Sequence, residues 1–370
     1  MAQIYGGPGK YIQGYGELKN VQQHIAFLGK NFLLLASKNR MKDRGQELLD
    51  HLDNGFEITK VEFNGESSWA EVDRVASIGK AAKVDAIIGM GGGKVIDTAK
   101  TASDKLGCAM VIIPTIAASD ACVGSLAVIY NEDGSLDQEV HFNKNPEIVI
   151  VDTEVIMNAP VRFLVSGMGD ALSTYFGAKV AYEQYQTNEY GGLPTEASMA
   201  LSRLSYDLLL KHGLAAKIAC EQKVMTKDLE KIIETNVLLS GLGMESSGAA
   251  SDHTFYYAFC ELTHRHEYMY HGEYVAFSTL CMLVMMGASK ETIDEVERFC
   301  ISVGLPVTLE DMRLHDLTDE EWKIVTNSVL AQDGPKRHPF KVTEADALAA
   351  IKTADAIGKM YKEEGKSLLV

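Results

Sequence analysis

Three residues in the second half of the chain have side chains that could bind one metal ion together. Asp170 lies in SGMGDALSTYFGA, His253 in SDHTFYYAF and His271 in YHGEYVAF. Two imidazoles and one carboxylate leave a coordination position for water or a substrate oxygen, which a catalytic zinc requires and iron also accepts. On one straight helix, His253 and His271 would be about 27 Å apart. They can therefore share an ion only if the chain reverses between them, and we expect that reversal at 262–270 (LTHRHEYMY).

Other histidines compete for the same role. His264 and His266 are two residues apart, so they would face opposite sides of a helix or the same side of a strand. The run HEYMYH is one residue too long for HExxH, which argues against a metalloprotease. A hydrogen-bonded or surface role is the better interpretation for His24, His51, His141, His212, His315 and His338. Residue type alone leaves that interpretation open for His253 and His271 too. The chain contains no GxSxG motif, so a serine hydrolase has no support.

A second group of candidates lies in a glycine-rich stretch at 85–100, DAIIGMGGGKVIDTAK. A short apolar run is followed by four glycines within Gly89–Gly93 and then by helical spacing. Glycine lets backbone approach a ligand, and a helix N-terminus attracts phosphate, so Gly92, Gly93 and Lys94 are candidates for a pyrophosphate site. The spacing matches neither the Walker motif nor the Rossmann fingerprint. A tight turn without a ligand therefore stays open.

The segment at 112–130, IIPTIAASDACVGSLAVIY, follows the end of a predicted strand. In a parallel sheet it would lie beside the glycine turn, at the carboxyl ends of the strands, where such sheets bind ligands. It contains Thr115 and Asp120. Asp120 could cap a helix or bind a substrate hydroxyl, and its residue type slightly favours the cap.

The first 150 residues alternate short apolar runs with helical patterns. Strands are expected at 32–36, 58–63, 86–89, 110–113 and 148–151, and helices at 41–52, 68–83 and 92–106. This alternation predicts a parallel sheet with helices on both faces. Two β-prone arms within 125–140 flank Asp133 and Gly134 and predict a hairpin.

From about residue 152 the pattern becomes helical. Helices are expected at 154–157, 161–185, 195–211, 226–246, 249–263, 271–286, 289–303, 318–332 and 343–364. Pro160 interrupts the pattern, so we expect an α/β domain at 1–158 and an all-α domain at 159–370. No flexible linker is visible, and we expect a rigid cleft between the two.

Composition limits the possible functions. The 370 residues are 46% hydrophobic and 23% charged, which is typical of a globular protein. The net charge of −16 argues against nucleic acid or an anionic membrane as the main partner, but not against a bound dinucleotide. Six cysteines without a CxxC pair indicate reduced thiols and a cytoplasmic protein. We find no signal peptide and no apolar stretch long enough for a membrane span.

Seven motifs together resemble one family. They are PGKYIQG (8–14), GGGKVIDTAK (91–100), PTIAASDA (114–121), LAVIY (126–130), VIVDT (149–153), GMGDALSTYF (167–176) and YHGEYVAF (270–277). In this order they resemble the glycerol dehydrogenase branch of the iron-containing alcohol dehydrogenase superfamily. The resemblance implies a dehydroquinate synthase-like fold, in which a Rossmann-like nucleotide-binding domain precedes a helical metal-binding domain. It also implies a homo-oligomer, with an octamer among the expected forms.

The resemblance also implies roles for individual residues. Asp170, His253 and His271 would bind the metal. Zinc is favoured over iron because Thr174 stands where the iron-dependent branch has a histidine. Thr115, Leu126 and Tyr130 would line the nicotinamide, with Gly92, Gly93 and Lys94 at the pyrophosphate and Asp120 at the polyol. Ala118 and Gly124 stand where polar cofactor contacts are expected.

Two departures affect specificity. Where NAD-dependent members of the family have an acidic residue for the ribose, this chain has Ser37, with Lys38 and Arg40 nearby. NAD is the expected cofactor, and this position would also accept the extra phosphate of NADP. Tyr256 replaces a histidine one helical turn after His253.

The resemblance therefore implies a metal-dependent oxidoreductase that transfers a hydride between a small polyol, such as glycerol or another vicinal diol, and a nicotinamide cofactor. The alternative is a 2-hydroxy-acid or 2-keto-acid reductase with the same metal site. A glycerol phosphate dehydrogenase is less expected, because no Lys or Arg cluster accompanies the metal motifs. A non-catalytic nucleotide-binding protein would lack the metal site altogether.

Overall fold

The structure is a computed structural model that describes residues 1–132, 134–265 and 268–367. Asp133, at the predicted hairpin turn, and His266, one of the competing histidines, lie outside the described residues. The chain forms two compact units. One unit comprises Gly6–Pro160 with Lys223–Met225, and the other takes in Met1–Tyr5 and the remainder of the chain from Val161 onward. No helix in the described part of the chain is both long and apolar enough to span a membrane.

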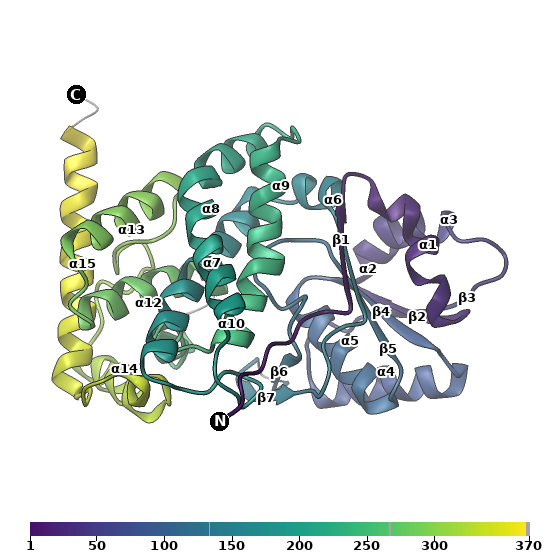
Figure 1. Ribbon diagram of the computed structural model, residues 1–370, viewed down its shortest axis with the longest axis horizontal. Helices are drawn as coiled ribbons and strands as arrows, with labels where there is room; N and C mark the ends of the chain where they lie inside the picture. Colours follow the sequence, from purple (N-terminus) through teal and green to yellow (C-terminus); the bar gives the residue numbers. More distant parts are fainter. Residues whose placement is uncertain (133, 266–267, 368–370) are drawn as a thin grey trace. The chain divides into compact units, whose positions relative to one another are not determined.

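The first unit is built on a six-stranded sheet in which all neighbouring strands are parallel (Figure 1). In spatial order the strands are β1 (Lys10–Gly14), β8 (Ile148–Asp152), β5 (Ala109–Pro114), β4 (Ala86–Gly91), β2 (Asn31–Ala36) and β3 (Glu57–Glu62). The central strands are buried along nearly their whole length, as expected when helices cover both faces. The predicted Rossmann-like parallel sheet is confirmed.

Helices cover both faces of this sheet. Side chains of α1 (Val21–Ile25) and α3 (Gln46–Asp50) share one apolar core with Phe32 and Leu34 of β2. On the other face lie α4 (Trp69–Ala82) and α5 (Gly93–Leu106), which pack against each other. The helix α6 (Thr153–Asn158) follows β8.

The edge strand β1 was not predicted. Its sequence, KYIQG, contains a single aliphatic residue, and its side chains are exposed or half-buried. Because β1 pairs only with β8, it does not need the continuous apolar sequence that marks the central strands. The predicted hairpin is present as β6 (Leu126–Tyr130) and β7 (Leu136–His141), which pair antiparallel outside the main sheet.

The second unit is helical, as predicted. Its helices are α7 (Val161–Glu183), α8 (Glu196–Glu221), α9 (Lys227–Glu234), α10 (Ser240–Ser247), α11 (Thr254–Cys260), α12 (His271–Met285), α13 (Lys290–Val303), α14 (Asp319–Ala331) and α15 (Glu344–Ser367). Hydrogen bonds between Thr318 and Glu321 form a capping box at the start of α14. Most side chains of α7 and α12 are buried, so these two helices form the centre of the unit.

The predicted helix at 249–263 is wrong at both ends. Only α11 forms there, and the residues before it make turns instead. The carboxylate of Asp252 accepts a hydrogen bond from the Ala250 N–H at 2.6 Å, and His253 is the N-cap residue of α11. An aspartate that binds the backbone in this way competes with helical hydrogen bonding, and that places the start of the helix after His253.

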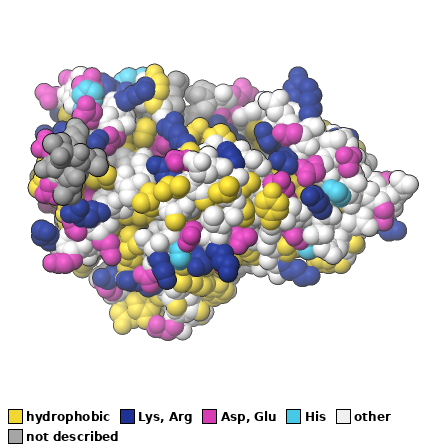
Figure 2. Space-filling model, turned by 90° about the horizontal axis from the view of Figure 1, so that it is seen from above, with side chains coloured by type: hydrophobic (Ala, Val, Ile, Leu, Met, Phe, Trp, Pro, Cys, Tyr) yellow, Lys and Arg dark blue, Asp and Glu magenta, His cyan; other side chains and the backbone are white. Residues whose placement is uncertain are grey.

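Side chains of both signs are interspersed over the face shown in Figure 2. Lys and Arg groups lie among Asp and Glu groups, with apolar and uncharged atoms between them. Among the described side chains on this face, the cations do not form the continuous positive surface that a nucleic acid would require.

Candidate metal and cofactor sites

Asp170 and His271 come together where α7 and α12 cross at very short range. A Cβ atom on Gly169 would lie 2.1 Å from the Gly272 carbonyl oxygen, and one on Gly272 would lie 1.8 Å from the Ser166 carbonyl oxygen. Only glycine allows backbones to approach this closely. Asp170 directly follows Gly169 and His271 directly precedes Gly272, so the crossing brings these two metal candidates close together.

The start of α12 is held in place by a charged network. The guanidinium of Arg162, on α7, donates to both carboxylate oxygens of Glu273, at 2.6 and 2.7 Å. Glu273 also accepts from the Tyr270 N–H at 2.7 Å, as part of a capping box. His271 is the first residue of the helix, so this network fixes the backbone from which its imidazole projects.

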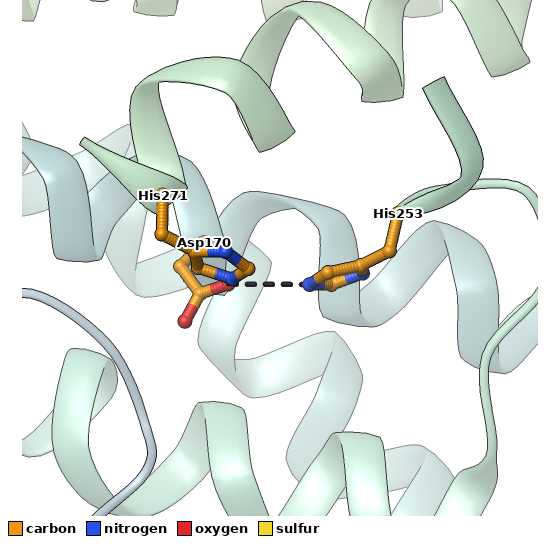
Figure 3. Close-up of side chains that lie close together, drawn as sticks. All are labelled: Asp170, His253 and His271. Carbon is orange, nitrogen blue, oxygen red and sulfur yellow. Dashed lines mark hydrogen bonds and ion pairs between the residues drawn. The ribbon is translucent and has the colours of Figure 1, made fainter. Parts of the chain in front are cut away.

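The two imidazoles and the carboxylate come from three separate elements and point at one another (Figure 3). The Nε2 atoms of His271 and His253 lie 3.0 and 3.4 Å from Oδ1 of Asp170. One ligand atom from each residue lies within 4.8 Å of the other two. Asp170 is buried, and both histidines are partly exposed, so the group can be reached from solvent.

Electrostatics at this group favour a cation. Burial raises the pKa of Asp170, but the two imidazoles outweigh that effect and hold it well below its ordinary value. Burial lowers the pKa of His253, and its hydrogen bonds to the Asp170 and Asp252 carboxylates more than reverse this. Two carboxylates thus flank one imidazole, an arrangement that would stabilise a divalent cation. Two nitrogens and one oxygen are a donor set that fits zinc or iron with a position left open.

Two neighbouring residues shape the surroundings of the metal candidates. The Tyr256 ring meets the His271 ring edge-on, with centroids 4.5 Å apart and planes at 88°. Thr174, one turn beyond Asp170 on α7, is buried and hydrogen-bonds to Ser240 Oγ at 3.0 Å. The threonine hydroxyl is therefore engaged in packing between helices.

The competing histidine that the structure describes has another partner. His264 Nε2 lies 2.9 Å from Glu321 Oε1, and Arg265 donates to the same carboxylate. Both lie in the segment where the sequence predicts a reversal between His253 and His271. Its described residues form turns between α11 and α12.

In the α/β unit, the glycines of the predicted phosphate turn have different roles. Gly89 and Gly91 make room for α5, since Cβ atoms there would lie 2.6 Å from Ala99 Cβ and 2.7 Å from Val95 Cβ. A Cβ on Gly93 would meet no atom within 4 Å. Gly92 is the N-cap of α5, and no side chain caps this helix. The first turn of α5 therefore combines exposed backbone with the positive end of the helix, as phosphate binding requires.

Lys94 lies at this turn with two neighbours. Its ammonium is 2.6 Å from Glu66 Oε2 and 5.2 Å from the centre of the Tyr130 ring. The structure thus places Lys94 and Tyr130, two predicted cofactor residues, side by side. Glu66 was not predicted, because one acidic residue in a loop carries no distinguishing pattern.

The predicted nicotinamide and substrate residues lie in β6 and in the segment that connects β5 to it. Thr115 follows β5, is buried and donates its N–H to the Gly91 carbonyl at 2.9 Å. Leu126 and Tyr130 are the first and last residues of β6. Ala118 and Gly124 lie in the loop between, half-buried and buried respectively.

Asp120 does not cap a helix. The described residues between β5 and β6 form turns and bends and contain no helix. The preference for a capping role, which residue type slightly favoured, is therefore wrong. The half-buried Asp120 remains a candidate for a substrate contact.

Lys100 anchors this loop and was also missed. It is fully buried, and its ammonium donates to the carbonyl oxygens of Ala121 at 2.7 Å, Gly124 at 3.4 Å and Leu126 at a shorter distance. Asp97 Oδ1 lies 3.6 Å away, and burial raises the pKa of that carboxyl to about 6. Fully buried lysines are rare, so the presence of a lysine on an otherwise buried helix face was the feature of the sequence that could have indicated a structural role for Lys100.

Ser37 is the residue predicted to determine the choice between NAD and NADP. It follows β2 and is the half-buried N-cap residue of α2 (Lys38–Arg40). Because β2 pairs with β4, Ser37 lies at the same edge of the sheet as the glycine turn. Nearby, Arg40 forms an ion pair with Asp43 at 2.9 Å.

Comparisons with known proteins agree with this arrangement. Residues 8–153 match the family described as iron-containing alcohol dehydrogenase. The chain is 41% identical over 364 residues to a glycerol dehydrogenase of Citrobacter freundii, covering 98% of this chain and 99% of that protein. It is 37% identical to a glycolaldehyde reductase of Halobacterium salinarum, over 98% of this chain and 100% of that protein. The crystal structure of glycerol dehydrogenase from Schizosaccharomyces pombe matches with a TM-score of 0.94 at 32% identity, covering 98% of this chain and 93% of that one. The chain belongs to the iron-containing alcohol dehydrogenase family.

Proposed function

We propose that this protein is a metal-dependent dehydrogenase that transfers a hydride between a small polyol, such as glycerol or another vicinal diol, and a nicotinamide cofactor. The observation that carries the proposal is the convergence of Asp170, His253 and His271 in a chain 41% identical, along almost its whole length, to a glycerol dehydrogenase. The alternative of a 2-hydroxy-acid or 2-keto-acid reductase is not favoured.

The metal would be held by Asp170 Oδ1 and the Nε2 atoms of His253 and His271, whose short separations support this assignment. When bound, the cation would supply Lewis-acid polarisation of a substrate hydroxyl, and the nicotinamide would supply the hydride acceptor. Zinc is the metal we propose. A three-residue N/N/O set with an open position suits catalytic zinc, and the Thr174 hydroxyl is bound to Ser240 instead of extending the set.

The cofactor would bind along the carboxyl edge of the parallel sheet. Gly92, Gly93 and Lys94 would bind the pyrophosphate, which the open space at Gly93 and the helix terminus support. The nicotinamide end would lie against the loop after β5, with Thr115, Leu126 and Tyr130 as side-chain contacts and Ala118 and Gly124 as places of close approach. The Lys100 ammonium holds that loop in place by donating hydrogen bonds to backbone carbonyls of the loop and of Leu126.

Asp120 is the residue we propose for the polyol. A carboxylate at this half-buried position can accept a hydrogen bond from a substrate hydroxyl and begin a path for its proton. Replacing it with asparagine would keep the shape and remove the basic group. We expect this variant to lose turnover and to change the pH profile, and full turnover with an unchanged profile would exclude the role.

Cofactor choice is expected to depend on Ser37. A neutral residue there leaves room for the 2′-phosphate of NADP, while the resemblance to NAD-dependent members of the family favours NAD as the principal cofactor. We therefore propose NAD, with NADP accepted as well.

A reductive direction is the second candidate, because the chain is 37% identical to a glycolaldehyde reductase over its full length. Reduction of a small hydroxyaldehyde would use the same metal and cofactor residues, with the hydride moving the opposite way. The substrate would differ from glycerol chiefly in size and oxidation state.

A cofactor-reduction screen tests these proposals. Glycerol, propane-1,2-diol, butane-2,3-diol and 2-hydroxy acids are compared with NAD and NADP, and glycolaldehyde is tested with the reduced cofactors. We expect the vicinal diols to be oxidised with NAD. Activity only with hydroxy acids would reject the polyol assignment, and faster turnover of glycolaldehyde than of any diol would favour the second candidate.

We further propose that residues 1–158 form the nucleotide-binding domain and 159–370 the metal-binding domain of a cytoplasmic homo-oligomer, with an octamer as the specific expectation. The six cysteines are free thiols, which suits a reducing compartment. Light scattering of the purified protein tests the assembly, and a monomeric mass would contradict it.

A further inference from the structure

Asp252 lies directly before the metal candidate His253 and has both carboxylate oxygens in use. Its Oδ2 is 3.0 Å from His253 Nδ1, and its Oδ1 accepts from the Ala250 N–H at 2.6 Å. The residue is only 1% exposed. A carboxylate can only accept, so the His253 Nδ1 atom must be the donor.

A glycine on another helix makes room for this carboxylate. A Cβ atom on Gly177 would lie 2.5 Å from Oδ1, 2.6 Å from Cγ and 2.7 Å from Oδ2 of Asp252. Real side chains do not tolerate such distances, so residue 177 must be glycine if Asp252 is to keep this position. Gly177 lies about two turns beyond Asp170 on α7. The helix that supplies Asp170 therefore also makes room for the Asp252 carboxylate, which bonds the second metal candidate, His253.

The hydrogen bond determines which imidazole nitrogen is free to bind a metal. A neutral imidazole carries one N–H, and the contact with Asp252 places it on Nδ1. In the neutral ring that a metal ion requires, the lone pair is then on Nε2, the atom that lies 3.4 Å from Asp170 Oδ1 and donates to it only while it carries a proton. The same contact fixes the orientation of the ring, because His253 occupies the N-cap position of α11 and has no helical residue before it.

We propose that Asp252 is a positioning residue for the metal site, which holds the His253 imidazole in the tautomer and orientation that direct Nε2 to the ion, and that Gly177 is required for this. The inference rests on the proposed metal-binding function. Outer partners of this kind typically change metal affinity 10–100-fold when they are removed.

Asp252→Asn is the sharpest substitution, because Asn has the same shape but one acceptor fewer. The two donors meet different oxygens of Asp252, so an asparagine in the same position turns an NH₂ group, which cannot accept, toward either the Ala250 N–H or His253 Nδ1. Zinc affinity is measured by competition with a chelator, and circular dichroism reports whether each variant is folded. We expect zinc binding about 10–100-fold weaker than in the parent. The matched control is Asp207→Asn, which removes an exposed carboxylate paired with Arg203 on α8 and is expected to leave zinc affinity unchanged.

Gly177→Ala tests the same arrangement from α7. Alanine is the better helix former at an interior position, so weakened zinc binding in this variant is attributable to the contact with Asp252. It also keeps the test decisive if Asp252→Asn does not fold. Unchanged zinc affinity in a folded Asp252→Asn protein would overturn the role of Asp252. If Asp252→Asn does not fold, unchanged zinc affinity in a folded Gly177→Ala protein would overturn it.

His253→Ala separates this inference from the proposed function. If zinc binding is lost in His253→Ala but unchanged in Asp252→Asn, the metal site stands and only the positioning role is wrong. If His253→Ala binds zinc as tightly as the parent, the metal site itself is wrong, and the inference falls with it.

Discussion

Replacing Lys100 by methionine tests how the cofactor loop is held. Methionine keeps an unbranched side chain of similar length but cannot donate a hydrogen bond. The substitution would leave the carbonyls of Ala121, Gly124 and Leu126 without the ammonium, and it would leave Asp97 without its nearby cation.

The expected cost follows from this burial. An unsatisfied buried polar group costs about 1–3 kcal/mol, and breaking a buried charge pair by removing one partner costs about 3–5 kcal/mol. The loop can move toward water and recover part of this loss, so the terms do not simply add. We expect the free energy of unfolding of the α/β unit to fall by about 3–5 kcal/mol, which corresponds to about 6–20 °C in Tm.

Thermal unfolding and NAD titration of the parent and the variant provide the assay. Affinity for NAD should fall as well, because Gly124 lies on the released loop and Leu126 begins the strand that follows it. Lys105→Met is the matched control, since Lys105 lies on the same helix with its side chain half-exposed and paired with Asp73. This control should change stability by no more than about 1 kcal/mol. A Lys100→Met protein within 1 kcal/mol of the parent, with unchanged NAD affinity, would refute the anchoring role.

Three further predictions concern other charged and aromatic groups. Burial, with Asp311 nearby, raises the pKa of Glu297 to about 8, so the folded protein holds a proton there that the unfolded chain releases near pH 4.5. The stability that this group contributes is therefore present below pH 4.5 and is lost as pH rises toward 8, and the free energy of unfolding falls by up to about 1.4 kcal/mol per pH unit. Glu297→Gln should reduce this dependence of the free energy of unfolding on pH, as measured by denaturant titrations. Glu66→Gln would release Lys94 from its ion pair and should tighten NAD binding about two- to fivefold by calorimetry, whereas weaker binding would mean that Glu66 itself contacts the cofactor. Tyr256→Ala removes a ring contact worth about 0.5–1.5 kcal/mol from His271 and should weaken zinc binding about two- to tenfold, while Tyr256→Phe should not; equal effects of the two would point to the hydroxyl.

The parallel sheet could be predicted because burial on both faces requires continuous apolar strands, and β2, β4 and β8 have them. The edge strand β1 could not, because pairing on one side leaves its sequence almost free of that constraint. Helix length was harder to predict than helix existence. The start of α11 depends on a side chain, Asp252, that bonds the backbone just before it.

The donor residues of the candidate metal site could be identified from their types and from the resemblance, but their proximity could not be derived from spacing. The approach of Asp170 to His271 depends on two glycines, Gly169 and Gly272, where helices distant in sequence cross. A local pattern cannot express such a crossing. The motifs do contain these glycines, directly beside the metal candidates.

Residues that act through other residues were not predicted. The roles of Lys100 and Asp252 arise from burial and from partners that the fold supplies, although a lysine on an otherwise buried helix face was a signal for Lys100. Glu66 is similar, since its contact with Lys94 joins a loop to the first turn of α5, two segments that the sequence leaves unrelated. Only tertiary structure distinguishes Asp252 and Glu66 from surface charges.

The central claim is that hydride transfer by this protein requires a metal held by Asp170, His253 and His271. The most direct test follows NADH formation from glycerol by the intact protein, by the same protein after chelation with its metal content checked, and after zinc is restored, with His271→Ala treated in parallel. We predict that chelation abolishes the reaction, that zinc restores it in the parent, and that zinc does not restore it in the variant. A metal-free parent that keeps its full rate would contradict the claim.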